Sequence, residues 1–175
     1  RAGLRRRDGA VSSAKIMLLG EIGVGKSSLA RRFVFDRFDA DYKSTIGVDI
    51  LTHDTRLEDG ASMRLVLWDT DGEFGTRIFD TVYVKGASGA LIVSDATRPA
   101  TLEKAARLAT RFQESFPGRP VRVVVNKTDL AEPDARALDA AGLAPQAVLR
   151  TSARTGEGVA DMFRALASDI ARRGL

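Results

Sequence analysis

The sequence predicts an α/β protein of three layers, in which helices cover both faces of a six-stranded and mostly parallel sheet. Short apolar runs rich in Val, Leu and Ile alternate with segments whose apolar residues recur at helical spacing, a pattern typical of right-handed βαβ units. A Gly-rich loop, residues 20–27, directly follows the first apolar run. In sheets of this kind ligands bind beyond the carboxyl ends of the strands, and we expect the functional site there.

The first half of the chain contains three of the expected strands. Residues 15–19 form an apolar run, and a helix is expected after Lys26. Residues 48–57 and 63–68 predict two strands joined by the turn Glu58-Asp59-Gly60, because glycine readily adopts the positive φ that a tight hairpin needs. We therefore expect this pair of strands to be antiparallel.

The second half contains the remaining strands. Residues 90–94 and 121–125 are dense in Val, Leu and Ile, as expected of central parallel strands covered on both faces. Between them, a helix is predicted from the spacing of Leu102, Leu108, Phe112 and Phe116. Residues 146–151 predict a last short strand. An amphipathic helix is expected after it, with an apolar stripe at Val159, Met162, Phe163, Leu166 and Ile170. We interpret this stripe as core packing, and a partner-binding face is the alternative. In all, about five helices are expected.

A length of 175 residues and a hydrophobic content of 44% favour one globular domain, residues 14–175. The 27 basic and 23 acidic residues of the whole chain are interspersed, so charge does not indicate nucleic-acid binding. Residues 1–13, with the basic cluster Arg5 to Arg7, are predicted to be a flexible head. We interpret this head as a solvated tail or cloning remnant, and a contact with a membrane or an acidic partner is the alternative.

The chain contains no Cys, which excludes disulfides, thiolate metal sites and lipids attached through Cys, and fits a reducing compartment. No apolar stretch approaches the roughly 18 residues that span a bilayer, and the start lacks the layout of a signal peptide. We therefore expect a cytoplasmic monomer without a membrane anchor of its own.

Residues Gly20 to Ser27, GEIGVGKS, match the phosphate-binding pattern G-x-x-x-x-G-K-[ST] between a predicted strand and a predicted helix. The glycines let the backbone curl so that its N–H groups face phosphate oxygens, and the helix adds its positive end. Lys26 would contact the β- and γ-phosphates, and Ser27 would bind Mg²⁺. The fold class is thus that of P-loop NTPases, with an ordinary Gly-rich turn as the alternative. The loop residues expected to bind nucleotide are Ile22, Gly23, Val24, Gly25, Lys26, Ser27 and Ser28.

A second motif, Asn126-Lys127-Thr128-Asp129, points to guanine as the base. An ionised carboxylate only accepts hydrogen bonds, and guanine presents two adjacent donors where adenine presents an acceptor, so Asp129 should select guanine. After the next predicted strand, Thr151-Ser152-Ala153-Arg154 can bring a backbone N–H to guanine O6. The residues expected to bind the base are Asn126, Lys127, Asp129, Ser152, Ala153 and Arg154.

With these motifs the chain resembles the Ras-like small GTPases, and most closely their Rab branch, over residues 14–173. The residues that carry the resemblance are the two motifs above together with Thr45-Ile46-Gly47-Val48-Asp49, Trp68-Asp69-Thr70 and Tyr83-Val84-Lys85-Gly86-Ala87. The resemblance implies GTP or GDP bound with Mg²⁺. It also implies switch loops at 37–50 and 69–83 that respond to the γ-phosphate and contact an effector, an exchange factor or an activating protein.

The resemblance also assigns individual residues. It implies a metal site of Ser27, Thr45 and Asp69, with Thr45 joining the ion only in the triphosphate state, and a Gly72 N–H on the γ-phosphate. Further nucleotide contacts are implied for Phe38, Tyr42, Thr45 and Gly72. Phe38 would place its aromatic ring against the base, and the alternative is that it is a core residue. An apolar effector surface, with burial as the alternative for each residue, is implied at Ile50, Trp68 and Tyr83. The catalytic set would be Lys26, Thr45, Gly72 and Glu73.

The second switch departs from the family, because it reads Asp69-Thr70-Asp71-Gly72-Glu73 where Ala-Gly-Gln usually follows the Thr. Glu73 stands at the position of the Gln that orients the attacking water, and a carboxylate cannot donate as an amide does. Asp71 adds a second negative charge, and Ile22 could obstruct an activating arginine from a partner. We expect slow hydrolysis, or weaker binding of GTP than of GDP.

Three readings follow from the sequence. The leading one is a GTPase switch. The alternative is a nucleotide-dependent interaction module, a GTPase-like domain of a larger protein with little or no hydrolysis. A P-loop kinase or other ATP-using enzyme is the third, and residues 126–129 argue against it.

Overall fold

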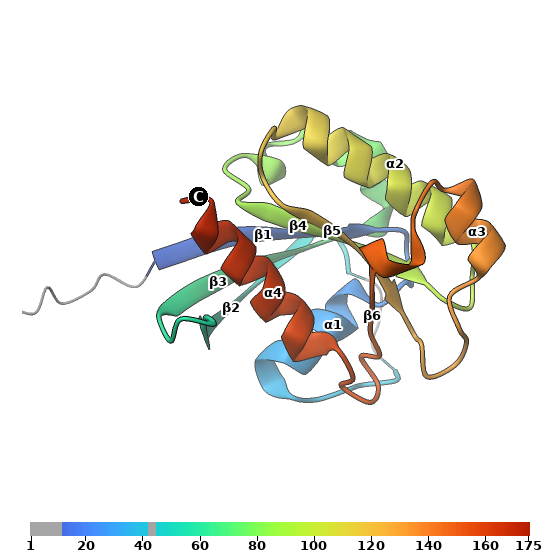
Figure 1. The fold of residues 1–175 in the computed structure, drawn as a ribbon, viewed down its shortest axis with the longest axis horizontal. Helices are drawn as coiled ribbons and strands as arrows, with labels where there is room; N and C mark the ends of the chain where they lie inside the picture. The colour runs from blue at the N-terminus through green and yellow to red at the C-terminus, as the bar shows by residue number, and fades with distance from the viewer. Residues whose placement is uncertain (1–11, 42–44) are drawn as a thin grey trace, which may run out of the picture.

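A computed structural model describes residues 12–41 and 45–175, and it has a six-stranded sheet between two layers of helices (Figure 1). The sheet has the order β2-β3-β1-β4-β5-β6, and only its β2–β3 pair is antiparallel. Its strands are β1 (Ser12–Gly20), β2 (Val48–Arg56), β3 (Ser62–Thr70), β4 (Gly89–Asp95), β5 (Val121–Asn126) and β6 (Val148–Arg150). The predicted mostly parallel sheet is confirmed.

The described residues include four α-helices and three 3-10 helices. The α-helices are α1 (Lys26–Phe35), α2 (Ala100–Ser115), α3 (Ala135–Ala140) and α4 (Val159–Arg172). The 3-10 helices are η1 (Gly72–Asp80), η2 (Val82–Val84) and η3 (Pro145–Ala147). Within these described residues no helix combines the length and the apolar character that crossing a bilayer requires.

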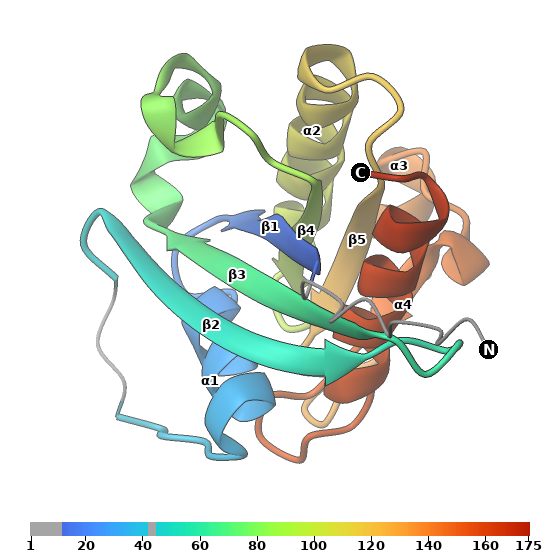
Figure 2. The same ribbon diagram turned by 90° about the vertical axis from the view of Figure 1, so that its left-hand side faces the viewer.

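The two faces of the sheet bury two separate hydrophobic cores. Helices α1 and α4 cover one face, and α2 and α3 cover the other (Figures 1 and 2). The α4 stripe packs into the first core, where Phe163 stacks on Phe33 of α1 with ring centroids 4.3 Å apart. All five residues of that stripe are buried, which confirms core packing as their role.

The β2–β3 hairpin forms as the sequence predicts. Gly60 has φ +83°, and the Leu57 N–H donates to the Ala61 carbonyl at 2.8 Å, which closes the turn. The register pairs Ile50 with Trp68 and Asp49 with Asp69. The end of β3 is thereby attached to the segment that follows the first switch region.

Several element boundaries differ from the predicted ones for local reasons. The last strand starts at Val148 rather than at 146, because Pro145 with its restricted φ begins the 3-10 turn of η3. Helix α2 ends at Ser115, and Phe116 lies beyond it with its ring 4.9 Å from that of Phe112. Strand β1 already begins at Ser12, which pairs with Met63, whereas residues 1–11 of the predicted head lie outside the described residues.

The topology brings the functional motifs to one edge of the sheet. The P-loop follows β1, residues 71–73 follow β3, residues 127–129 follow β5, and residues 151–154 follow β6. These strands run parallel, so their carboxyl ends lie at the same edge. Four loops far apart in the sequence therefore meet there.

At the opposite edge, a carboxylate on α4 links the helix to β5. The side chain of Asp169 is 12% exposed and forms ion pairs with Arg122 of β5 and with Arg172, the latter at 2.6 Å. Burial works against its ionisation, but hydrogen bonds from Arg122 and Arg172 outweigh burial and hold the pKa of Asp169 below its ordinary value of 3.8.

Replacing Asp169 by Asn is expected to lower the free energy of unfolding by about 1 kcal/mol at neutral pH, a modest loss because both arginines remain partly solvated. A group with a lowered native pKa stabilises the fold above its unfolded pKa, and this contribution disappears as the pH falls through the native pKa. In urea titrations the difference between parent and Asp169→Asn should therefore shrink below the ordinary pKa of 3.8. A difference that persists unchanged in acid would assign the effect to packing instead.

Candidate nucleotide-binding site

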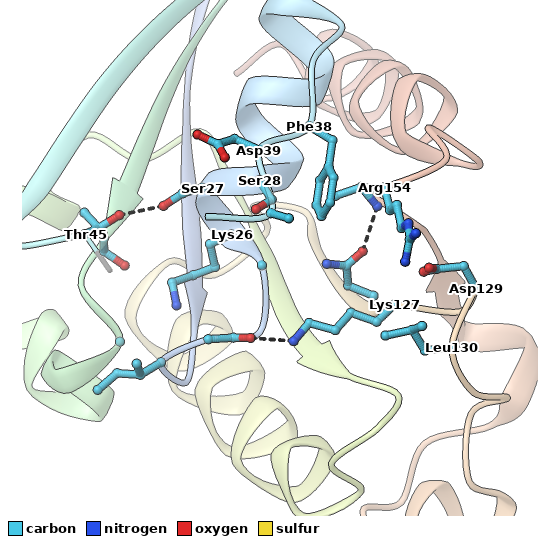
Figure 3. A pocket seen from close by; sticks show the side chains of 18 of the residues that line it. Lys26, Ser27, Ser28, Phe38, Asp39, Thr45, Lys127, Asp129, Leu130 and Arg154 are labelled. Atoms are coloured by element: carbon cyan, nitrogen blue, oxygen red, sulfur yellow. Dashed lines mark hydrogen bonds between the residues drawn. The ribbon is translucent and has the colours of Figure 1, made fainter. Parts of the chain in front are cut away.

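A cavity of about 590 Å³ lies beyond the carboxyl ends of the strands (Figure 3). At one end it is lined by the P-loop and by both predicted switch loops, and at the other by the segments after β5 and β6. The predicted site residues that line it are Ile22, Gly23, Gly25, Lys26, Ser27, Ser28, Phe38, Thr45, Gly72, Asn126, Lys127, Asp129, Ala153 and Arg154.

The P-loop backbone requires glycine at two positions. Gly25 precedes α1 with φ +102°, and a Cβ there would clash with Nδ2 of Asn126. Gly20 has φ +145°, and a Cβ there would clash with the Val93 carbonyl of β4. The left-handed backbone and the close packing together leave room only for glycine at both positions. Val24 lies beneath the loop, fully buried in the first core rather than facing the cavity.

Lys26 is buried at the start of α1 and is held inside the P-loop. Its Nζ donates to the carbonyl oxygens of Gly20 and Glu21, both at 2.8 Å. Burial lowers the pKa of Lys26 to about 8, although the carboxylates of Asp69 and Asp71 act in the opposite direction. A phosphate group in the cavity would supply the negative charge that a buried ammonium lacks.

Three oxygen-bearing side chains from a helix, a loop and a strand meet beside Lys26: Ser27 of α1, Thr45 of the loop before β2, and Asp69 of β3. The Ser27 and Thr45 hydroxyl oxygens are 2.5 Å apart, Ser27 also donates to Asp69 Oδ2, and Thr45 donates to the same oxygen at 3.1 Å. Asp69 is 2% exposed, and its other oxygen, Oδ1, has no hydrogen-bond partner among residues 12–41 and 45–175. Burial raises the pKa of Asp69 despite the hydrogen bonds it accepts. A cluster of hydroxyls with a partly unpaired buried carboxylate fits a hard cation such as Mg²⁺.

The base-recognition segments are joined by hydrogen bonds. Asn126 Nδ2 donates to the Val24 carbonyl at 3.0 Å, and Asn126 Oδ1 accepts from the Ala153 N–H at 3.2 Å. Ser152, which is buried and does not line the cavity, donates to Asp129 Oδ1 at 2.9 Å. The Asp129 side chain is therefore oriented at the cavity, and within the described residues its Oδ2 accepts no hydrogen bond from the protein. A carboxylate held in this way can accept hydrogen bonds from a ligand that carries donors.

The walls of this end of the cavity are apolar. Phe38 is 39% exposed and points into the cavity across from the stem of Lys127 (Figure 3), so it is not a core residue. Leu130, 61% exposed, extends the apolar wall, although no sequence signal marked it. Two apolar surfaces on either side of a slot suit a flat aromatic ring. Tyr42, which the resemblance assigned to the nucleotide, lies outside the described residues.

The second switch lies against the P-loop. A Cβ on Gly72 would clash with the backbone of Glu21 and Ile22, so this contact requires glycine. Asp71 lines the cavity, and its Oδ1 accepts from the Glu73 N–H at 2.9 Å, which caps η1. Glu73 itself is exposed and is not among the residues that line the cavity. The structure therefore does not bring Glu73 together with the other predicted catalytic residues.

The predicted effector surface is only partly exposed. Ile50 is 51% and Tyr83 36% exposed, whereas Trp68 is half-buried against the second core. Lys15 Nζ lies 3.7 Å from the centre of the Trp68 ring. Ile46, with 91% exposure, is the most exposed large apolar side chain in the described structure.

Some residues around the cavity were not predicted. Those that line it are Asp39, Ala40, Thr70 and Leu130, whereas Asp71, which also lines it, was expected to add negative charge at this site. Arg32 of α1 acts from outside: its Nε donates to the Ala153 carbonyl at 2.8 Å, and its Nη2 donates to the Arg154 carbonyl. An arginine on an amphipathic helix carries no sequence signal of such a contact, because its partners are backbone groups more than a hundred residues away.

Comparison with known proteins agrees with this geometry. The profile of the Ras family matches residues 15–172. The GTP-binding protein ypt5 of Schizosaccharomyces pombe is 39% identical over 163 residues, which cover 89% of this chain and 77% of the relative. Ras-related protein RABA1b of Arabidopsis thaliana is 35% identical over 176 residues, covering 98% and 81%. RABF2a of the same plant is 33% identical over 165 residues, covering 91% and 82%.

The chain therefore belongs to the Ras family of small GTPases. Within that family, its similarity to Rab-type relatives assigns it to the Rab branch. It is a small GTPase switch protein of a family that binds GTP and GDP with Mg²⁺, hydrolyses GTP, and interacts with effectors, exchange factors and activating proteins.

Asp69→Asn is expected to separate metal binding from stability. Removing the charge should weaken the Mg²⁺-dependent retention of GDP by at least about tenfold, since a ligand-orienting carboxylate is lost. The same change should not lower the free energy of unfolding of the nucleotide-free protein, because a buried and partly unpaired charge disappears. Asp54→Asn, in an exposed ion pair with Arg64 on the β2–β3 hairpin, is the control and should leave GDP retention unchanged. Equal GDP retention in Asp69→Asn and the parent would contradict the proposed metal site.

Proposed function

We propose that this chain binds GTP and GDP with Mg²⁺ in the cavity of Figure 3 and acts as a slowly hydrolysing switch through loops 37–50 and 69–83. The observation that carries the proposal is the composition of this one cavity. A buried ammonium and glycine-dependent backbone lie at one end, and an oriented carboxylate with apolar walls lies at the other. That separation of charge matches a ligand with phosphates at one end and a donor-bearing purine at the other.

Each end has a separate task in this proposal. The P-loop N–H groups and Lys26 bind phosphate, and Ser27, Thr45 and Asp69 hold Mg²⁺, which would neutralise charge on the phosphate oxygens. Thr45 lies in the first switch region, and Asp71 and Gly72 lie in the second. Since both switch regions line the phosphate end of the cavity, loss of the γ-phosphate would remove contacts from both loops at once.

Slow hydrolysis is supported by what surrounds the phosphate end. Glu73 stands at the family position of the water-orienting residue, and its carboxylate cannot donate a hydrogen bond to a phosphoryl oxygen as the amide of Gln can. The carboxylate of Asp71 lines the cavity and interacts electrostatically with Lys26, so it competes with a γ-phosphate for that ammonium. Ile22 is 40% exposed at the rim, where it narrows access for an arginine from a partner. Asp71 also favours GDP over GTP for the same electrostatic reason.

The role of Asp129 is tested by Asp129→Asn. The amide of Asn can donate to the C2 carbonyl of xanthine but cannot accept from both donors of guanine. We expect affinity for GDP to fall by about two orders of magnitude while affinity for xanthosine diphosphate rises, as measured by competition binding. Glu132→Gln removes a nearby carboxylate that pairs with Arg150 and does not line the cavity, and it should change neither affinity. An unchanged preference for guanine in Asp129→Asn would exclude the proposed base recognition.

The role of Glu73 is tested by Glu73→Gln in single-turnover hydrolysis of GTP. The amide both accepts from a water and donates to a phosphoryl oxygen, so the rate should rise by at least about tenfold. Asp80→Asn, an exposed change in the same 3-10 helix, should have no effect. A rate no faster in Glu73→Gln than in the parent would contradict this explanation of slow hydrolysis. Undetectable phosphate release by both proteins, with GTP bound, would instead favour a nucleotide-dependent interaction module.

A further inference from the structure

Three successive P-loop residues are each held from outside by a cation from another segment. Lys104 of α2 pairs with Glu21 at 2.5 Å, and Arg98, in the turn between β4 and α2, donates from Nη2 to the Ile22 carbonyl at 2.8 Å. Lys127 donates to the Gly23 carbonyl at 2.8 Å, as the dashed line in Figure 3 shows. We call Lys104, Arg98 and Lys127 the cationic clamp.

One buried carboxylate fixes two members of this clamp. Asp95 at the end of β4 is 1% exposed, and its Oδ2 accepts from Lys127 Nζ at 2.7 Å and from Arg98 Nε at 3.1 Å. Its Oδ1 accepts from the Thr97 N–H and hydroxyl at 2.8 and 2.6 Å. Because every hydrogen bond to the Asp95 carboxylate is charge-assisted, the side chains of Arg98 and Lys127 have little freedom to move away from the P-loop.

The geometry of the peptide bond gives the clamp a consequence for the loop. In a trans peptide the C=O and the following N–H point in opposite directions. The carbonyl of Ile22, directed toward Arg98, therefore turns the Gly23 N–H away from it, and the Gly23 carbonyl on Lys127 does the same for the Val24 N–H. Hydrogen bonds from cations to these carbonyls also polarise the peptide groups, which makes their N–H groups stronger donors.

We propose that Arg98 is a positioning residue for phosphate binding, acting through the Ile22–Gly23 peptide, with Asp95 holding Arg98 in place. The inference rests on the proposed function. Arg98 does not line the cavity, so it acts on bound phosphates through the loop rather than by contact. Its side chain is 43% exposed, and without it Asp95 keeps its contacts with Lys127 and Thr97. Replacement of Arg98 therefore leaves the buried Asp95 carboxylate paired and removes one donor from the carbonyl of Ile22, a residue that is 40% exposed, so the variant should fold.

The test compares Arg98→Ala, Arg98→Lys and the control Arg107→Ala. Arg107 is also a cation of the α2 region, but it pairs with Glu103 at 3.7 Å, with a 62% exposed side chain, and makes no P-loop contact that the structure records. The GDP dissociation rate is measured in Mg²⁺, and guanosine affinity is measured by competition. Loss of a charge-assisted hydrogen bond should make GDP release about tenfold faster in Arg98→Ala. Arg98→Lys should restore part of the difference, and Arg107→Ala should match the parent.

Guanosine separates positioning from a general structural role, because it lacks phosphates. If Arg98 is a positioning residue, Arg98→Ala should weaken the binding of GDP, while its affinity for guanosine stays within about twofold of that of the parent. An equal loss for both ligands, or a release rate in Arg98→Ala equal to that of the parent, overturns the inference and leaves the proposed function standing. A parent protein that fails to retain GDP at all overturns both.

Discussion

The buried side chain of Asn126 is the junction on which the site depends. It is 1% exposed, it donates to the P-loop at Val24, and it accepts from Thr151 and from the Ala153 N–H. Its amide also fills the space that a side chain at Gly25 would need, so the left-handed turn of the P-loop and the position of Asn126 require each other. Through this one amide the phosphate loop and the base segments are held at a defined separation. A change in the backbone position of either loop should therefore alter the position of the other.

The charges around the cavity are arranged for a ligand rather than for the stability of the free protein. The ammonium of Lys26 is buried with a lowered pKa, and Asp69 is buried with a raised pKa and an unpaired oxygen. Both cost free energy unless an opposite charge is bound. Phosphates and Mg²⁺ would relieve the two costs together, which explains why such groups are retained in an otherwise apolar α/β core. Stability and nucleotide binding are thus linked in this fold.

The residues of the second switch that differ from the family pattern also affect the charge around the phosphate end of the cavity. Asp71 keeps a structural task, because it caps η1 through the Glu73 N–H, and it also adds a carboxylate beside Lys26. Glu73 lies in a 3-10 segment whose geometry the sequence did not indicate, and this segment directs the side chain to solvent. Position 73 therefore differs from the family in the chemistry of its side chain, and its exposure follows from the 3-10 segment that carries it. Membership of the family alone conveys neither of these effects.

The sequence by itself determined the sheet, its βαβ order and the two ligand-binding motifs, because hydrophobic periodicity and glycine-dependent turns are local properties. It marked Gly25, Lys26, Asn126 and Asp129 for the same reason, since each belongs to a short motif. Only the tertiary structure decided that Leu130 forms a wall, that Arg32 holds the Ala153 loop, and that Asp95 and Arg98 support the P-loop. Arg32 and Arg98 reach backbone carbonyls 121 and 76 positions away, and no local pattern encodes such partners. Burial and exposure, including the exposed side chain of Glu73, likewise follow from packing rather than from residue type.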